Sequence, residues 1–157
     1  MPLKDVGPGA DLYIKRCEIR DRLCALGHEA HFSEDVWTPE RFRLSGLNLK
    51  VGEFLQAQSY DYIVCLMASP GSIAEVHDFA NDRRLASRMM ICVDKAHQDG
   101  YSASGALRIF EGFNGKLSWF DNPVDVKECY LMGRVIEHVD KVAEGRQYVM
   151  ATAWGPQ

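Results

Sequence analysis

The sequence lacks any apolar run approaching the roughly 20 residues that a membrane-spanning helix needs. Met1–Ala10 carries two prolines and two glycines and shows no signal-peptide pattern. An excess of basic residues is also missing, because the formal net charge is −4, whereas non-specific nucleic-acid binding requires a basic face. We therefore expect a cytoplasmic protein that makes no membrane contact and no direct nucleic-acid contact.

The cysteines are few, and no two of the five have Cys-x-x-Cys spacing. Cys65 and Cys92 lie within apolar, strand-like runs, where cysteine behaves as a small hydrophobic residue. This usage predicts reduced thiols, as in a cytoplasm. No spacing of His, Cys and Asp suggests a metal site, and we expect neither a metal nor a cofactor.

Internal repeats, low-complexity runs and linkers are absent as well, so 157 residues predict a single domain. Apolar residues make up 46% and charged residues 25%, which is ordinary globular composition. We expect an irregular lead-in over residues 1–10 and a loose tail over residues 146–157.

The most informative stretch runs from a buried strand into a helix. Tyr62–Ala68 is almost continuously apolar, which is typical of a strand buried on both faces of a parallel sheet. The turn Ser69–Ser72 interrupts it, and helical spacing then continues to about Ala86. Ser72 is predicted as the N-cap, with Glu75 in the capping-box position three residues later. Proteins with open α/β sheets bind ligands at such a junction between the end of a strand and the start of a helix.

The remaining chain alternates helical and strand-like patterns. Helices are expected over Asp11–Leu26, where Gly27 ends the helix, and over Leu47–Gln58, Ala106–Glu111 and Asp125–Glu144. Further strands are expected at His28–Phe32, Met89–Val93 and Lys116–Phe120. This order predicts an α/β fold, a three-layer sandwich with a mostly parallel, flavodoxin-like sheet of four to five strands. An opening strand could come only from Leu3–Val6: either it is very short or the chain begins late.

The segment D-Y-I-V-C-L-M-A-S-P-G-S-I-A-E, from Asp61 to Glu75, resembles the nucleoside 2-deoxyribosyltransferase-like and TIR-like group of N-glycosidases. It is similar in particular to bacterial members with an SPGS-x-AE turn, which include effectors of retron anti-phage systems. The resemblance implies N-glycosidic cleavage or transfer on a nucleoside, nucleotide or NAD-type substrate. It also implies that Glu75 acts on the anomeric carbon, as nucleophile or oxocarbenium stabiliser, and that the protein is a homo-oligomer.

Glu75 is the expected catalytic residue, and the alternative is a helix-capping glutamate with no chemical role. The expected substrate-binding residues surround the turn or follow strands: Ser69, Pro70, Gly71, Ser72, Asp78, Glu34 and Asp94. Asp78 is an auxiliary carboxylate or part of a solvated helix face. Glu34 and its neighbour Asp35 follow the second expected strand, where a ribose-binding acid would sit.

Other candidates have two interpretations each. Arg16 and Arg20 lie one helical turn apart and hold a phosphate or form a charged outer face. Trp37 and Tyr101 stack a base or anchor loops. The function also has alternatives, namely a non-catalytic nucleotide sensor and a TIR-like interaction module. In a homo-oligomer we expect Val135, Val139 and Val142, or the stretch 148–154, to be buried between subunits.

Overall fold

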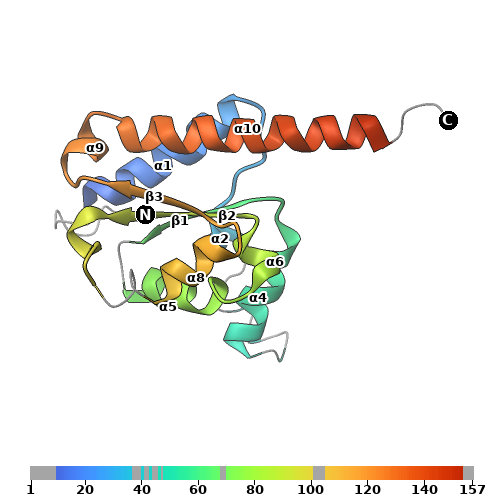
Figure 1. The fold of residues 1–157 in the computed structure, drawn as a ribbon, viewed down its shortest axis with the longest axis horizontal. Helices are drawn as coiled ribbons and strands as arrows, with labels where there is room; N and C mark the ends of the chain where they lie inside the picture. Colours follow the sequence, from blue (N-terminus) through green and yellow to red (C-terminus); the bar gives the residue numbers. More distant parts are fainter. Residues whose placement is uncertain are drawn as a thin grey trace.

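The computed structural model describes residues 10–36, 40, 43, 46, 48–67, 70–100 and 105–153. They form a parallel sheet with helices on both faces (Figure 1), which confirms the α/β class. The strands are β1 (Ile63–Met67), β2 (Met89–Asp94) and β3 (Lys116–Phe120). β2 is central, with Ile63 of β1 opposite Met89 and Lys116 of β3 opposite Met90.

The helices fall into two layers (Figure 1). One face of the sheet carries α1 (Ala10–Ala25), α9 (Val124–Lys127) and α10 (Tyr130–Ala153). The opposite face carries α4 (Leu49–Ser59), α5 (Pro70–Phe79), α6 (Arg83–Ala86) and α8 (Ala106–Gly112). Two short elements, α2 (Ser33–Val36) and the 3₁₀ helix η1 (Lys95–His97), contain no buried residue.

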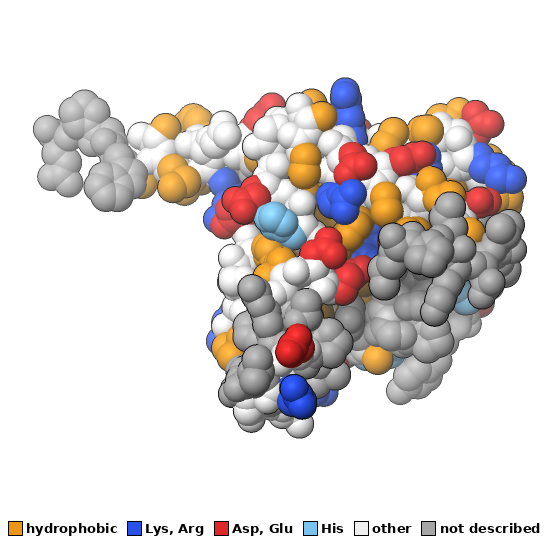
Figure 2. Space-filling view, turned by 180° about the vertical axis from the view of Figure 1, so that it is seen from behind, with side chains coloured by type: hydrophobic (Ala, Val, Ile, Leu, Met, Phe, Trp, Pro, Cys, Tyr) orange, Lys and Arg blue, Asp and Glu red, His pale blue; other side chains and the backbone are white. Residues whose placement is uncertain are grey.

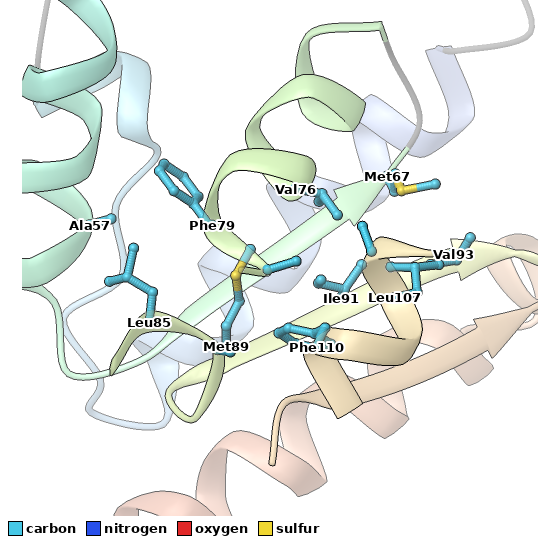
Figure 3. Close-up of a cluster of buried hydrophobic side chains, with 13 residues drawn as sticks. Ala57, Met67, Val76, Phe79, Leu85, Met89, Ile91, Val93, Leu107 and Phe110 are labelled. Atoms are coloured by element: carbon cyan, nitrogen blue, oxygen red, sulfur yellow. The ribbon is translucent and has the colours of Figure 1, made fainter. Parts of the chain in front are cut away.

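β2 contributes to a hydrophobic core on each face because its side chains alternate. Met89, Ile91 and Val93 enter the first core, among side chains from α4, α5, α6 and α8 (Figure 3). Met90 and Cys92 enter the second core, with α1, α9 and α10. Both faces of this strand are therefore buried. The sequence predicts such burial for β1 instead, where only Met67 is buried and the other four residues are half-buried, because β1 lies at the edge of the described sheet.

The ends of α1 follow from local sequence. Gly27 has φ +93°, a conformation that glycine adopts without steric cost. The Gly27 N–H donates to the Cys24 carbonyl, and the His28 N–H donates to the Leu23 carbonyl. This pair of hydrogen bonds forms a Schellman motif, so Gly27 ends the helix as predicted.

The expected strand at His28–Phe32 is wrong, because this segment is irregular. Its apolar content is low, and the Phe32 ring is covered by the guanidinium carbons of Arg16 and Arg20, at 4.2 Å and 4.5 Å from the ring centroid. The described residues thus form three strands rather than four to five. Leu3–Val6, the other expected strand, lies outside the described residues.

Helix α5 differs from its prediction at both ends. It begins at Pro70 rather than Ser72 and ends at Phe79 rather than near Ala86. Proline suits the first helical position, where no backbone N–H is needed. After the break, the Asp82 side chain accepts a hydrogen bond from the Arg84 N–H and caps the separate helix α6.

The terminal helix also differs from its prediction. Asp125 lies inside the short helix α9, and α10 begins only at Tyr130. α10 then continues to Ala153, so residues 146–153 are helical rather than part of a tail. None of the described helices is both long and apolar enough to cross a membrane.

Only the first half of α10 packs on the sheet. Val135 is fully buried within the chain and so is not available for the subunit contact that we expected, whereas Val139 is partly buried against the second core. The second half projects beyond the rest of the fold (Figure 1) and displays hydrophobic side chains (Figure 2). Those of Tyr148, Val149 and Met150 are exposed.

Candidate functional site

The carboxyl ends of the strands meet the amino terminus of α5. β1 ends at Met67, and α5 begins at Pro70. Met67, the last residue of β1, lies opposite Val93 of β2. Asp94 follows Val93 and lies opposite Phe120, the last residue of β3. We call this region the carboxyl edge. Ligands of open parallel sheets bind in this position.

The first turn of α5 comes from the SPGS sequence. Pro70, Gly71 and Ser72 are the first three residues of the helix, where backbone N–H groups have no intrahelical acceptor and the helix dipole favours an anion. Ser72 is therefore not the N-cap, which corrects our prediction. Ser69, also expected in the binding turn, lies outside the described residues.

Glu75 occupies the second turn of α5. Because the helix begins before Ser72, Glu75 does not stand three residues after the N-cap, and the capping box is wrong. Val76 and Phe79 enter the first core. Ser72 and Asp78 stand three residues before and three residues after Glu75 in this helix.

Asp78 contacts the neighbouring helix. The Lys50 Nζ of α4 lies 2.5 Å from Asp78 Oδ1, and both side chains are exposed. Burial and the nearby Asp78 charge raise the pKa of Glu53, one turn after Lys50 on α4. A carboxyl that stays protonated to higher pH has a property that general acids require. Sequence analysis missed Glu53, and only the proximity of Asp78 reveals it.

Asp94 is held by its own backbone turn at the carboxyl edge. Its Oδ1 accepts a hydrogen bond of 2.9 Å from the Ala96 N–H and so caps η1. Next to it, Lys95 Nζ lies 2.6 Å from Asp121 Oδ2, just after β3. One Asp94 oxygen is thus engaged in local structure, and the carboxylate keeps a fixed position at the strand end.

An ion pair between Asp125 and Arg134 continues this edge toward α10. Asp125 Oδ2 accepts hydrogen bonds from the Asp121 N–H at 3.0 Å and from Arg134 Nη2 at 2.5 Å. Burial opposes ionisation of Asp125, but these hydrogen bonds outweigh it and lower the pKa of the carboxyl. This network is not predictable from local sequence, because its members come from the residue after β3, from α9 and from α10.

Glu34 and Arg16, predicted separately, contact each other. Two parallel hydrogen bonds of 2.7 Å join Arg16 Nη1 and Nη2 to the two carboxylate oxygens of Glu34. The hydrogen bonds from Arg16 lower the pKa of Glu34. Arg20 instead pairs with Asp21 at 2.7 Å. The charges of Arg16 and Glu34 therefore largely neutralise each other.

The other candidates are not brought together. Trp37 and Tyr101 lie outside the described residues, and Asp35 is exposed on α2. Within the described parts of the chain, no group of three or more His, Cys, Asp or Glu side chains could hold a metal ion. Neither a scan against protein-family models nor a search of curated proteins finds a match to this chain.

Proposed function

We propose that this protein cleaves or transfers the N-glycosidic bond of a nucleoside, a nucleotide or an NAD-type substrate. Glu75 is the nucleophile or oxocarbenium stabiliser. The observation that carries the proposal is the amino terminus of α5 at the carboxyl edge, beside the end of β2. The stretch from Asp61 to Glu75, which resembles the N-glycosidase group, includes β1 and the first residues of α5.

Substrate binding follows from the groups at this edge. Backbone N–H groups at the start of α5 suit a phosphate or a sugar hydroxyl. Ser69, Pro70, Gly71 and Ser72 form the binding turn in this proposal. Asp94 offers a ribose hydroxyl the carboxylate oxygen that Ala96 leaves unused.

Two further candidates carry ion pairs that a substrate must compete with. Asp78 is paired with Lys50, and Glu34 is paired with Arg16. Glu34 binds a sugar hydroxyl only after its ion pair opens, because Arg16 donates to both of its carboxylate oxygens, whereas Lys50 donates to Oδ1 of Asp78 alone. Exposed pairs of this kind contribute little, about 0–1 kcal/mol, so such competition is feasible.

The proposed reaction breaks the bond between C1′ of the sugar and a nitrogen of the base, which leaves with the electron pair. Positive charge develops on the sugar, and the Glu75 carboxylate stabilises it or bonds to C1′. Water or a second base then bonds to C1′, and where Glu75 has bonded to C1′ its carboxylate leaves with the electron pair of that bond. The attacking group gives up its proton to the released base or to solvent, and the product is that of hydrolysis or of transfer. Nicotinamide is a good leaving group because it is cationic in NAD and neutral once released.

The test is base release by the purified protein from a panel of nucleosides, nucleotides and NAD, followed by chromatography. We expect Glu75→Gln to reduce turnover about 10²-fold or more, because the amide lacks the charge needed beside the cationic sugar. The free energy of unfolding should change by less than about 1 kcal/mol. Glu111→Gln is the matched control, an exposed glutamate on α8, and should retain full turnover.

The alternative functions are outcomes of the same experiment. Thermal stabilisation by a nucleotide, with no base release, would replace the enzyme by a non-catalytic sensor. If the protein shows neither base release nor thermal stabilisation by a nucleotide, the result would favour a TIR-like interaction module. Equal turnover in wild type and Glu75→Gln would exclude Glu75 as the catalytic carboxylate.

The proposed setting is a cytoplasmic homo-oligomer, and the resemblance implies a role in anti-phage defence. The exposed apolar side chains at the projecting end of α10 support self-association. Large exposed apolar surfaces are more common at protein interfaces than on monomers.

A further inference from the structure

A cavity of about 190 Å³ opens between β3 and α10, away from the carboxyl edge. Lys116 and Ser118 of β3 line it, and Lys116 is the first residue of that strand. The other wall is a stripe of α10 at helical spacing: Arg134, Glu137, His138 and Lys141. The cavity therefore lies toward the amino-terminal end of the sheet.

The charge of this cavity is opposite to that of the whole chain. The chain has a formal net charge of −4. Three cationic side chains line the cavity, and Glu137, its carboxylate, is paired with Lys141 at 2.6 Å. Lys116 has no ion-pair partner among the described residues. Positive charge in a concave site attracts anions.

Arg134 supplies an unused donor. Its Nη2 donates to Asp125 at 2.5 Å, which holds the guanidinium in place. Its Nε is buried and has no hydrogen-bond acceptor within the described part of the protein. A buried donor without an acceptor is destabilising and rare in native proteins. An anion oxygen in the adjoining cavity would supply the acceptor.

His138 completes the wall. Its Nε2 lies 2.7 Å from the Tyr62 hydroxyl. Burial raises the pKa of Tyr62, so this hydroxyl stays protonated and can donate to Nε2. Burial and the charges of Lys116 and Lys141 lower the pKa of His138. The ring is therefore neutral at pH 7, with its proton on Nδ1 when Tyr62 is the donor.

We propose that this cavity binds a phosphate group, either as inorganic phosphate or as the end of a small phosphate monoester. The bound oxygens accept hydrogen bonds from Lys116 Nζ, Arg134 Nε and Ser118 Oγ, and Lys141 adds charge. The volume is several times the roughly 30 Å³ of one water molecule. It is below the roughly 300 Å³ at which pockets hold drug-sized ligands, so it suits a phosphate group rather than a whole nucleotide.

The experiment is calorimetric titration of the full chain with inorganic phosphate, and separately with ribose 5-phosphate, at constant ionic strength because salt screens exposed charges. We expect saturable binding that Lys116→Gln weakens roughly tenfold or more, the effect of losing a charged hydrogen bond. Lys141→Gln removes a charge but no hydrogen bond to the anion, and should weaken binding by a smaller factor. Lys127→Gln is the matched control. It removes the same charge from an exposed lysine on α9 and should bind as wild type.

The relative affinities of the two probes distinguish the possible ligands. Tighter binding of the ester than of phosphate identifies the site as the phosphate end of a larger ligand, and the reverse identifies free phosphate. No binding of either probe, or equal weakening in all three lysine variants, overturns the proposal.

The pH dependence provides an independent readout. His138 faces Tyr62, Lys116, Arg134, Glu137 and Lys141. A bound anion favours the protonated ring, so binding of an anion with constant charge should tighten as pH falls through the histidine range. A phosphate monoester is protonated near pH 6, and inorganic phosphate at higher pH, so loss of anion charge opposes the tightening for both phosphate probes. Sulfate keeps its charge and should show the tightening alone. Sulfate binding that does not change with pH would contradict the role of His138.

Discussion

At the level of single residues, Gly115 shows how tightly the first core is closed. A Cβ built at this position would lie 2.4 Å from Cε2 and Cζ of Phe110. Phe110 is fully buried, so its ring cannot swing into solvent. The Gly115 N–H also donates to the Phe110 carbonyl, which fixes the turn between α8 and β3. The position therefore accepts only glycine without rearrangement of the core.

Gly115→Ala should lower the free energy of unfolding by about 1–3 kcal/mol, the usual cost of overpacking a core. Gly133→Ala is the control, because Gly133 lies within α10 and a Cβ there meets no atom within 4 Å. It should raise the free energy of unfolding by about 0.5–1 kcal/mol, since alanine favours the helix. Urea unfolding measures both. Equal effects of the two substitutions would show that Phe110 does not restrict position 115.

At the level of elements, the strands β1, β2 and β3 were predictable because their apolar runs are bounded by turn residues. The segment His28–Phe32 was not, because Phe32 is covered by two arginine side chains of α1 rather than by a sheet. Local propensity carries no information about such contacts. The extension of α10 to Ala153 is not predictable, because the Trp-Gly-Pro sequence that follows it favours an irregular tail.

The candidate sites also include some features that follow from local sequence and others that depend on tertiary contacts. The strand β1 and the presence of a helix after it were predictable from adjacent residues, but both ends of α5 differ from the prediction. The Arg16–Glu34 pair joins residues 18 positions apart, and its formation depends on the path of the chain after α1. The cavity-lining stripe of α10 has the spacing of an ordinary solvated helix face. Only its packing beside β3 distinguishes it.

The projecting end of α10 makes its own prediction. Light scattering at high micromolar concentration should give at least twice the mass of one chain. A double variant, Tyr148→Ser with Val149→Ser, should shift this mass toward the monomer, because both side chains are exposed and apolar. Val124→Ser, at an exposed apolar residue of α9, is the control and should not change the mass. A monomeric wild type would exclude self-association through α10.

At the level of the whole molecule, β2 belongs to both hydrophobic cores and forms the wall between them. Residues Ile91, Cys92 and Val93 have no exposed surface, and the strand is bonded to a neighbour on each side. Burial also raises the pKa of the Cys92 thiol to about 12. Neither helical layer can separate from the sheet without exposing one side of this strand.

The consequence concerns amide hydrogen exchange in D₂O. Backbone amides in the middle of β2 should exchange only when the entire domain unfolds, so their protection should equal the global free energy of unfolding. The amides of α2, which has no buried residue, should exchange by local opening and much faster. Mass spectrometry of peptic peptides distinguishes the two. Exchange of β2 as fast as α2, in a protein that circular dichroism shows to be folded, would mean that the two layers open independently.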